Sequence, residues 1–329
     1  DKERGVINEE WRTRMSAMQR FQEKLLPAMF AGTKYATCFP IGTMDVVMNF
    51  KPQTLRDYYE KWYRPDLQGI VAVGDIDVDA VEAQIKKLFA DVPAQPNAAK
   101  REYYPVNDNK EPIVLIARDK EQPHIQAIVF NKHKATPNSE KDKIGYLVEN
   151  YATNLINNML NARLNELLQE ANPPYIYAGS YDGDFFVAKT KQAFTGIVVC
   201  KEDAVESGIA TLLREMERAR RFGFTESEYQ RARAEYLRNL ESAYNERDKR
   251  KNDEYINEYV RHFLDNEPIP GIENEYGIIS QIAPSIPVEP LNMMMQTLVT
   301  DTNQVVAIFG PEKENLKMPT EDAIKKILH

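Results

Sequence analysis

Residues 62–66 and 70–75 read Trp-Tyr-Arg-Pro-Asp and Ile-Val-Ala-Val-Gly-Asp, and these two runs decide the fold. Before them, apolar residues recur at helical spacing after Pro52: Leu55, Tyr58, Tyr59 and Trp62. Proline suits the first turn of a helix, whereas the pair Pro65-Asp66 breaks one. The apolar run at 70–75 predicts a buried strand that ends in a turn. The stretch therefore predicts a helix with a buried side, a turn and a strand.

The same order of elements recurs near the end of the chain. Residues 305–310 predict a second buried strand, and an amphipathic helix through residues 291–298 precedes it. A long helix with two glutamates seven residues apart lies upstream of each strand: Glu3 and Glu10 in the first, Glu228 and Glu235 in the second. Because an ordered series that repeats indicates repeated structural units, we expect two related domains.

The boundary between these domains is predicted at residues 93–111, where prolines stand among polar residues without apolar periodicity. Residues 1–92 would then be the back half of a first unit, and residues 112–329 a complete second copy. The second copy is predicted to contain strands at 113–117, 125–130, 175–181, 193–200 and 305–310, and helices at 141–170, 202–222 and from Thr225 into the 240s. The predicted fold class is α+β, with each domain a mostly antiparallel sheet that has helices on one face.

Composition restricts the function. The 329 residues carry a net charge of −8 and are 43% hydrophobic and 28% charged, which is typical of a globular protein. The acidic surface argues against a nucleic-acid partner, and no apolar run approaches the roughly 18 residues needed to span a bilayer. Cys38 and Cys200 are far apart and are predicted to be two buried thiols.

The helix predicted from Lys2 to Leu26, ended by Pro27, carries the first pair of glutamates. Glu3 and Glu10 are two turns apart on one face, with apolar residues between them, so we expect this face to point inward. Buried carboxylates are costly unless they are paired or bound to a cation. The alternative is an exposed ion pair between Glu10 and Arg14 at i+4.

The first helix, the Trp-Tyr-Arg-Pro turn and the strand ending in Gly-Asp together resemble the M16 family of zinc metallopeptidases, which includes insulinase, pitrilysin and the mitochondrial processing peptidase. The resemblance covers nearly the whole chain. It implies that residues 1–92 are the back half of a first M16-like domain, truncated at its front, and that 112–329 are a second, non-catalytic one. It also implies that Glu10 is a zinc ligand and that Glu3 supports the site from the second shell of contacts.

An M16 site also needs a His-x-x-Glu-His motif, in which two histidines bind zinc and the glutamate is the general base. The four histidines of this chain do not form that motif: His124, His133, His262 and His329. The chain begins at Asp1 without an initiator Met, so we expect it to be part of a longer protein that carries the motif upstream. The chain alone is therefore predicted to be inactive and to hold no stoichiometric zinc.

One site feature of the family is altered. Family members often carry an arginine seven residues before a tyrosine, and both reach the substrate. Tyr175 matches the tyrosine and is predicted as a substrate contact, but Leu168 stands where the arginine would be. Arg163 is more than a turn away and is an alternative replacement. Strand core is the other interpretation of Tyr175.

The resemblance implies that the whole protein is a zinc endopeptidase, with zinc as cofactor and a peptide as substrate. Expected partners are the missing front half of the first domain and a second M16-like half or a second copy of the chain. Long bacterial members of the family favour the periplasm or cell envelope. Two alternatives stay open: a non-catalytic M16-like subunit that encloses substrate or supports a partner, and an interaction domain without metal chemistry.

Overall fold

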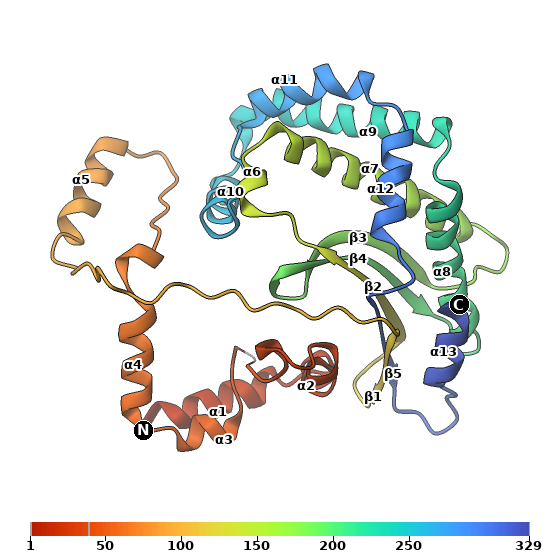
Figure 1. Ribbon diagram of the computed structural model, residues 1–329, viewed down its shortest axis with the longest axis horizontal. Helices are drawn as coiled ribbons and strands as arrows, with labels where there is room; N and C mark the ends of the chain where they lie inside the picture. The colour runs from red at the N-terminus through yellow and green to blue at the C-terminus, as the bar shows by residue number, and fades with distance from the viewer. Residues whose placement is uncertain (1, 39, 329) are drawn as a thin grey trace.

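The computed structural model describes residues 2–38 and 40–328, so Asp1, Phe39 and His329 lie outside the described residues. The first third of the chain is helical, and the remainder combines a sheet with helices (Figure 1). The helices are α1 (Lys2–Arg14), α2 (Ala17–Met29), α3 (Met44–Asn49), α4 (Pro52–Trp62), α5 (Val78–Leu88), α6 (Asn138–Lys141), α7 (Ile144–Leu167), α8 (Val205–Phe222), α9 (Glu226–Asn245), α10 (Asn252–Asp265), α11 (Ile272–Ile282), α12 (Glu289–Leu298) and α13 (Glu321–Leu328). The strands are β1 (Ile113–Asp119), β2 (Ile125–Lys134), β3 (Tyr177–Phe185), β4 (Ala188–Cys200) and β5 (Gln304–Pro311).

The five strands form one sheet in the order β1-β5-β2-β4-β3. β1 and β5 are parallel, and the other pairs are antiparallel. The last strand, β5, lies between β1 and β2, so the start and the end of residues 112–329 belong to one sheet. The α+β class and the mostly antiparallel sheet predicted for this part of the chain are therefore confirmed.

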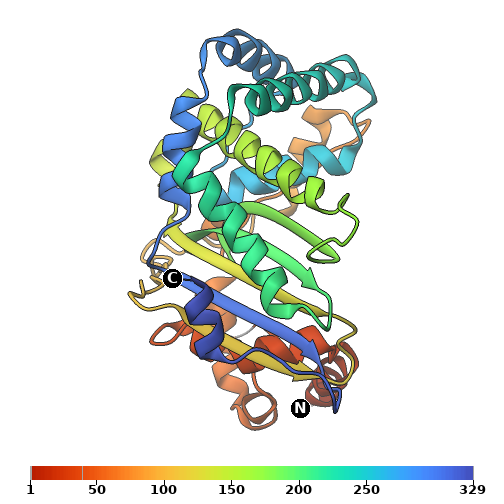
Figure 2. The ribbon, with the colours of Figure 1, turned by 90° about the vertical axis from the view of Figure 1, so that its right-hand side faces the viewer.

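The two faces of the sheet are covered by different parts of the chain (Figure 2). Helices α7, α8 and α12 pack on one face, around a core that includes Tyr151, Leu155 and Phe194. The other face is covered by α2, whose Phe21 is 0% exposed and lies 4.7 Å from Phe309 between ring centroids. The predicted arrangement of helices on one face is thus incomplete, because a helix from residues 1–92 covers the second face.

An ion-pair cluster fastens α2 to the end of β1. Arg20 donates to both carboxylate oxygens of Asp119, at 2.6 and 2.7 Å, and to Glu121 at 2.6 Å. These hydrogen bonds lower the pKa of Asp119 to about 2, against the opposing effect of its burial. The domain boundary predicted at residues 93–111 stays a prediction. α2, which precedes it, packs on β1 and β5, which follow it.

Several predictions for the first 92 residues are wrong in detail. The helix expected over residues 2–26 is two helices, because Ser16 caps the start of α2 through a bond from the Gln19 amide. Pro27 does not end α2, which continues to Met29; a proline this close to the end removes only one helical hydrogen bond. Residues 70–75 form no strand, and the apolar side of α4 is exposed, with Leu55 57% accessible.

The physical reason for these differences is the lack of a sheet in the described part of residues 1–92. A strand needs neighbours for its backbone N–H and C=O groups, and an amphipathic helix is buried only against another apolar face. The order of elements still repeats: α4, the extended segment 70–75 and α5 follow one another as α12, β5 and α13 do.

The predicted linker, which we call the strap (residues 93–111), has no helix or strand but is fastened along its length (Figure 1). Its first part is tied to α4 and to the turn after it, since Gln95 donates to the Glu60 carbonyl at 3.1 Å and Arg64 donates to the Ala99 carbonyl. Its second part is tied to the sheet, since Thr190 donates to the Tyr104 carbonyl at 2.7 Å. The strap is therefore an ordered connection.

Candidate functional site

The two glutamates that open the chain lie on α1, and both are exposed. α1 has no buried residue, and Val6 between them is 58% accessible. The prediction that this face points inward is therefore wrong for the described chain. The reason is that nothing covers this face in the part of the chain that the structure describes, although α1 packs against α3 on another side.

Glu10 makes the ion pair that was the alternative interpretation. Its carboxylate lies 2.8 Å from the Arg14 guanidinium, and its side chain is 45% exposed. Such a surface pair contributes at most about 1 kcal/mol, so it can be exchanged at low cost for another partner. The ligand role of Glu10 and the supporting role of Glu3 stay predictions.

The donor set of this chain does not fit a zinc ion by itself. Zinc takes four ligands, usually from Cys, His, Asp and Glu side chains. Among residues 2–38 and 40–328, the structure has no group of three or more such side chains that could hold a metal ion. One ion-paired carboxylate and a second two turns away are too few, so a zinc site at α1 would require ligands from outside this chain.

Tyr175 lies in the core, just before β3. It is 1% exposed, and its hydroxyl donates to the Leu164 carbonyl at 2.7 Å. Burial raises the pKa of Tyr175 to about 12, with a smaller effect from nearby acidic residues such as Glu215. This is the strand-core arrangement, and contact with a substrate would require the hydrogen bond to Leu164 to open.

Arg163, the alternative to the arginine missing at Leu168, is also in the core. Its guanidinium binds both carboxylate oxygens of Glu228, at 2.6 and 2.9 Å, and donates to the Gly223 carbonyl at 2.9 Å. Glu228 also closes the predicted capping box with Thr225 at the start of α9. Arg163 therefore joins α7 to α9 and does not face a substrate surface in this structure.

The histidines lie far from α1 in the sequence and in different elements. His124 is exposed before β2, and His262 on α10 is bonded through Nδ1 to the Glu267 carbonyl at 2.7 Å. His133 on β2 lies 2.7 Å from Asp182 on β3, reaching across β4 between them. This His133–Asp182 pair was not predicted, because its members are 49 residues apart and the topology alone brings them together.

Asp182 of this pair lines a polar cavity of ≈ 940 Å³ between α7, the β3–β4 hairpin and the end of α10. Carboxamides line its α7 wall at helical spacing: Asn150, Asn154, Asn157, Asn158 and Asn161. The Asn161 amide bonds to both backbone groups of Ser180 on β3, accepting at 2.6 Å and donating at 3.0 Å. The spacing of these asparagines was visible in the sequence and could have predicted one polar face.

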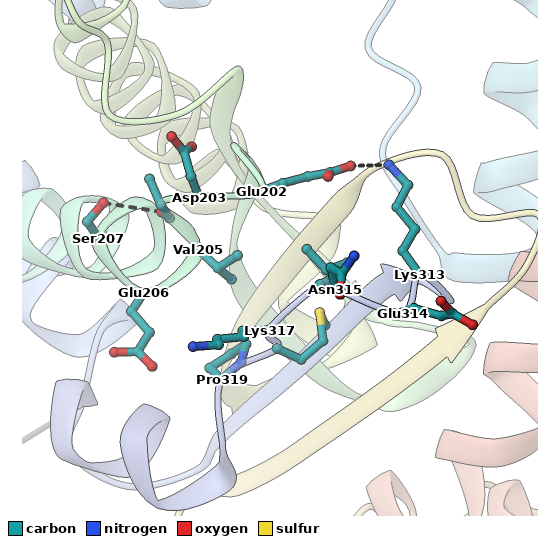
Figure 3. A pocket seen from close by; sticks show the side chains of 13 residues that line it. Glu202, Asp203, Val205, Glu206, Ser207, Lys313, Glu314, Asn315, Lys317 and Pro319 are labelled. Carbon is teal, nitrogen blue, oxygen red and sulfur yellow. Dashed lines mark hydrogen bonds and ion pairs between the residues drawn. The ribbon is translucent and has the colours of Figure 1, made fainter.

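A second cavity of ≈ 800 Å³ lies between the start of α8 and the loop before α13 (Figure 3). Six of its 13 lining residues are charged, and Lys313 is ion-paired with Glu202 across it. Ser207 is turned back to the Ala204 carbonyl at 3.2 Å. No histidine or cysteine lines this cavity, so its described residues offer hydrogen bonding but no nucleophile with a base.

Comparison with known proteins decides between the families that such an α+β fold could represent. The model of the peptidase M16 inactive domain matches residues 49–236, which is more than half of the chain. The chain belongs to the M16 peptidase family. The predicted resemblance is confirmed.

Two curated relatives have similar sequences over most of this chain. A zinc protease PQQL-like protein of Arabidopsis thaliana is 28% identical over 95% of the chain, which covers 29% of that protein. The probable zinc protease PqqL of Escherichia coli is 26% identical over 91% of the chain, which covers 32% of that protein. The chain therefore spans less than a third of the length of these relatives.

Solved M16 structures share the fold. The first half of the periplasmic protease PqqL from Escherichia coli aligns over 100% of this chain and 69% of its own, with a TM-score of 0.86 and 24% identity. In the part of the chain that the structure describes, no helix is both long and apolar enough to cross a membrane.

Proposed function

We propose that this chain is part of a larger zinc-dependent endopeptidase, in which Glu10 is a zinc ligand and Glu3 supports it. Membership of the M16 family carries the proposal, together with relatives that are named zinc proteases. The uncovered face of α1 supports it. Because Glu10 is exposed, its carboxylate can leave Arg14 and bind a zinc ion whose other ligands come from elsewhere. The histidines and the general base would come from the part of the longer protein that lies outside this chain.

The roles of the two domains follow from this proposal. Residues 1–92 would complete the catalytic domain, and residues 112–329 would be the non-catalytic domain that encloses a peptide substrate. A front half for the first domain and a second M16-like half are the proposed partners, since solved relatives contain more chain than is present here. We propose a periplasmic or envelope location, because a relative with this fold is a periplasmic protease.

The ligand role can be tested with neighbouring glutamates in the longer protein. We expect Glu10→Gln to abolish zinc binding and to reduce peptide cleavage by at least about 100-fold, and Glu3→Gln to cost about 10–100-fold. Glu9→Gln is the matched control, because Glu9 lies on the same helix and pairs with Arg12, at 2.7 Å. Metal analysis and cleavage of an unfolded peptide are the measurements. Full zinc content and cleavage in the Glu10→Gln protein would overturn the proposal.

A second candidate function is a non-catalytic M16-like subunit that encloses substrate or supports a partner. The match to the inactive-domain model favours it. The upstream sequence of the longer protein separates the two candidates: an intact His-x-x-Glu-His motif supports the enzyme, and its loss supports the non-catalytic subunit.

A further inference from the structure

Helix α7 carries more asparagines along the polar cavity than its packing uses. Asparagine is a weak helix former, because its side chain competes for backbone hydrogen bonds. Two of the five asparagines that line the cavity serve the sheet: Asn161 bonds to the Ser180 backbone, and Asn157 accepts from the Ser180 hydroxyl at 3.1 Å. The other three are exposed. The packing of α7 on the sheet therefore does not account for the whole of this wall.

Two of the exposed asparagines have hydrogen-bonding groups that are free to meet a ligand. The Asn154 amide donates to the Asn150 carbonyl at 2.8 Å, and the side-chain oxygen of Asn154 has no partner in the described chain. The Asn158 side chain makes no hydrogen bond to any residue that the structure describes. Asn154 and Asn158 are one turn apart, so they lie on one face of α7. Because a carboxamide has both donors and an acceptor, the two can bind neighbouring hydroxyl groups in either role.

Charged side chains around the cavity pair with one another. Lys189 lies 2.8 Å from Asp265 and 3.3 Å from Asp184, and Arg261 lies 2.9 Å from Glu267. A charged ligand would compete with these pairs, whereas a neutral ligand leaves them intact. The cavity therefore favours a neutral ligand that makes many hydrogen bonds.

Two tyrosines add aromatic rings to this polar lining. Tyr181 on β3 is 47% exposed and Tyr103 in the strap is 50% exposed, and both line the cavity. A tyrosine presents an apolar ring face together with a polar hydroxyl. A sugar ring has the matching chemistry, because its C–H face is apolar and its rim carries hydroxyl groups. One sugar can therefore pack on a tyrosine and bond to the carboxamides at the same time.

An extended peptide fits this wall less well. A peptide that adds to an edge strand uses the free backbone N–H and C=O groups of that strand. On β3, the Ser180 N–H donates to the Asn161 side chain at 2.6 Å, and the Ser180 carbonyl accepts from it at 3.0 Å. Asn161 thereby removes Ser180 from the groups that a peptide strand would need.

We infer that the polar cavity binds a neutral oligosaccharide. Asn154 and Asn158 bond to its hydroxyl groups, and Tyr181 packs against the face of a ring. The cavity of ≈ 940 Å³ is near the upper end of the range of about 300–1,000 Å³ typical of small-ligand sites, so it has room for more than one sugar ring. The inference goes beyond the proposed function, because the cavity lies within residues 112–329 and does not involve Glu10.

The test measures the binding of neutral trisaccharides to the longer protein. The probes are maltotriose, cellotriose and N,N′,N″-triacetylchitotriose, which differ in linkage and in substituents. Saturation-transfer NMR detects binding, and titration calorimetry gives its Kd. We expect at least one of these probes to bind with a Kd of about 1 mM or tighter.

Variants on α7 connect this binding to the cavity. We expect Asn158→Ala to weaken it at least about tenfold, because hydrogen bonds to the sugar hydroxyls are lost. Asn158 is exposed, so its replacement disturbs no core. Asn165→Ala is the matched control and should leave the Kd unchanged, because Asn165 is exposed on the same helix but lies outside the cavity.

Several results would overturn the inference. One is the absence of binding by all of the trisaccharides, and another is an equal Kd in the Asn158→Ala and Asn165→Ala proteins. Binding of an unfolded peptide in place of a saccharide, lost in Asn158→Ala, would also overturn it, because the cavity would then be a peptide site. Zinc content and peptide cleavage, measured on the same longer protein, report separately on the proposed function.

Discussion

The contact between Arg163 and Glu228 holds two helices together through one buried ion pair. Burial alone would raise the pKa of Glu228, but hydrogen bonds from Arg163 and Thr225 outweigh it and lower the pKa to about 2. We expect Glu228→Gln to cost about 3 kcal/mol in the free energy of unfolding at pH 7, because it leaves the Arg163 charge buried without its partner. Urea unfolding measures this cost.

Glu235→Gln is the matched control, since Glu235 is exposed on the same helix, and a change within about 0.5 kcal/mol is expected there. The pair stabilises the protein fully above the ordinary carboxyl pKa near 4.5, and this contribution is lost as the pH falls toward 2. Equal unfolding free energies for the two variants would show that the pair carries no net stability.

The His133–Asp182 pair predicts a pH dependence of the opposite sign. Burial disfavours the charged imidazole, but the hydrogen bond and charge of Asp182 outweigh it, so the pKa of His133 is raised. Its stabilising effect is present below the unfolded pKa near 6.5 and is lost as the pH rises through the folded value. An NMR titration of the His133 ring should give a midpoint above about 6.5.

Asp182→Asn should move that midpoint down, whereas Asp184→Asn should leave it nearly unchanged, because Asp184 pairs with Lys189 instead. A midpoint that is the same in the protein and in Asp182→Asn would contradict the assignment.

Local signals at single residues were predictable where both partners lie close in the sequence. The Thr225–Glu228 capping box was predicted and is present. Arg163, the distant partner of the same glutamate, could not be predicted, because only the packing of α7 on α9 brings it there. The prediction that Glu3 and Glu10 face inward was wrong for a related reason. A helix face is buried only when another element covers it, and spacing within the helix does not show whether one does.

At the scale of elements, Asn161 closes the outer edge of the sheet. β3 is an edge strand, and such strands expose backbone groups that can pair with another chain. The Asn161 side chain bonds to the N–H and C=O of Ser180 as a neighbouring peptide group would. We expect Asn161→Ala to speed hydrogen exchange of the Ser180 amide by about tenfold or more, since a lost bond of this kind is worth about 1–3 kcal/mol.

Asn154→Ala serves as the control for this prediction, because the Asn154 side chain bonds within α7, to the Asn150 carbonyl at 2.8 Å. Unchanged exchange at Ser180 in the Asn161→Ala protein would mean that the edge is protected by something else.

The strands and helices of residues 112–329 were largely predictable, because their apolar patterns and their partners are both in this chain. The strand predicted at residues 70–75 was not formed, although its pattern matches that of β5. An apolar pattern indicates that a segment can be buried in a sheet. The segment becomes a strand only when neighbouring strands are present to pair with it.

For the whole molecule, stability should be unevenly distributed between the two parts. α4 and α5 contain no buried residue, whereas β5 is buried throughout. We expect amides of α4 and α5 to exchange with solvent orders of magnitude faster than those of β5, because local opening exposes little apolar surface. Hydrogen exchange with mass spectrometry measures this, and uniform protection across the chain would contradict it.

The strap sets how freely these parts can move. Ala99 is bonded to Arg64, just after α4, and Tyr104 is bonded to Thr190 in the sheet. Residues 100–103 lie between these two bonds, and no hydrogen bond in the described chain joins them to α4 or to the sheet. Four residues span at most about 14 Å. A hinge at these four residues would allow only a pivot of limited amplitude between α4 and the sheet.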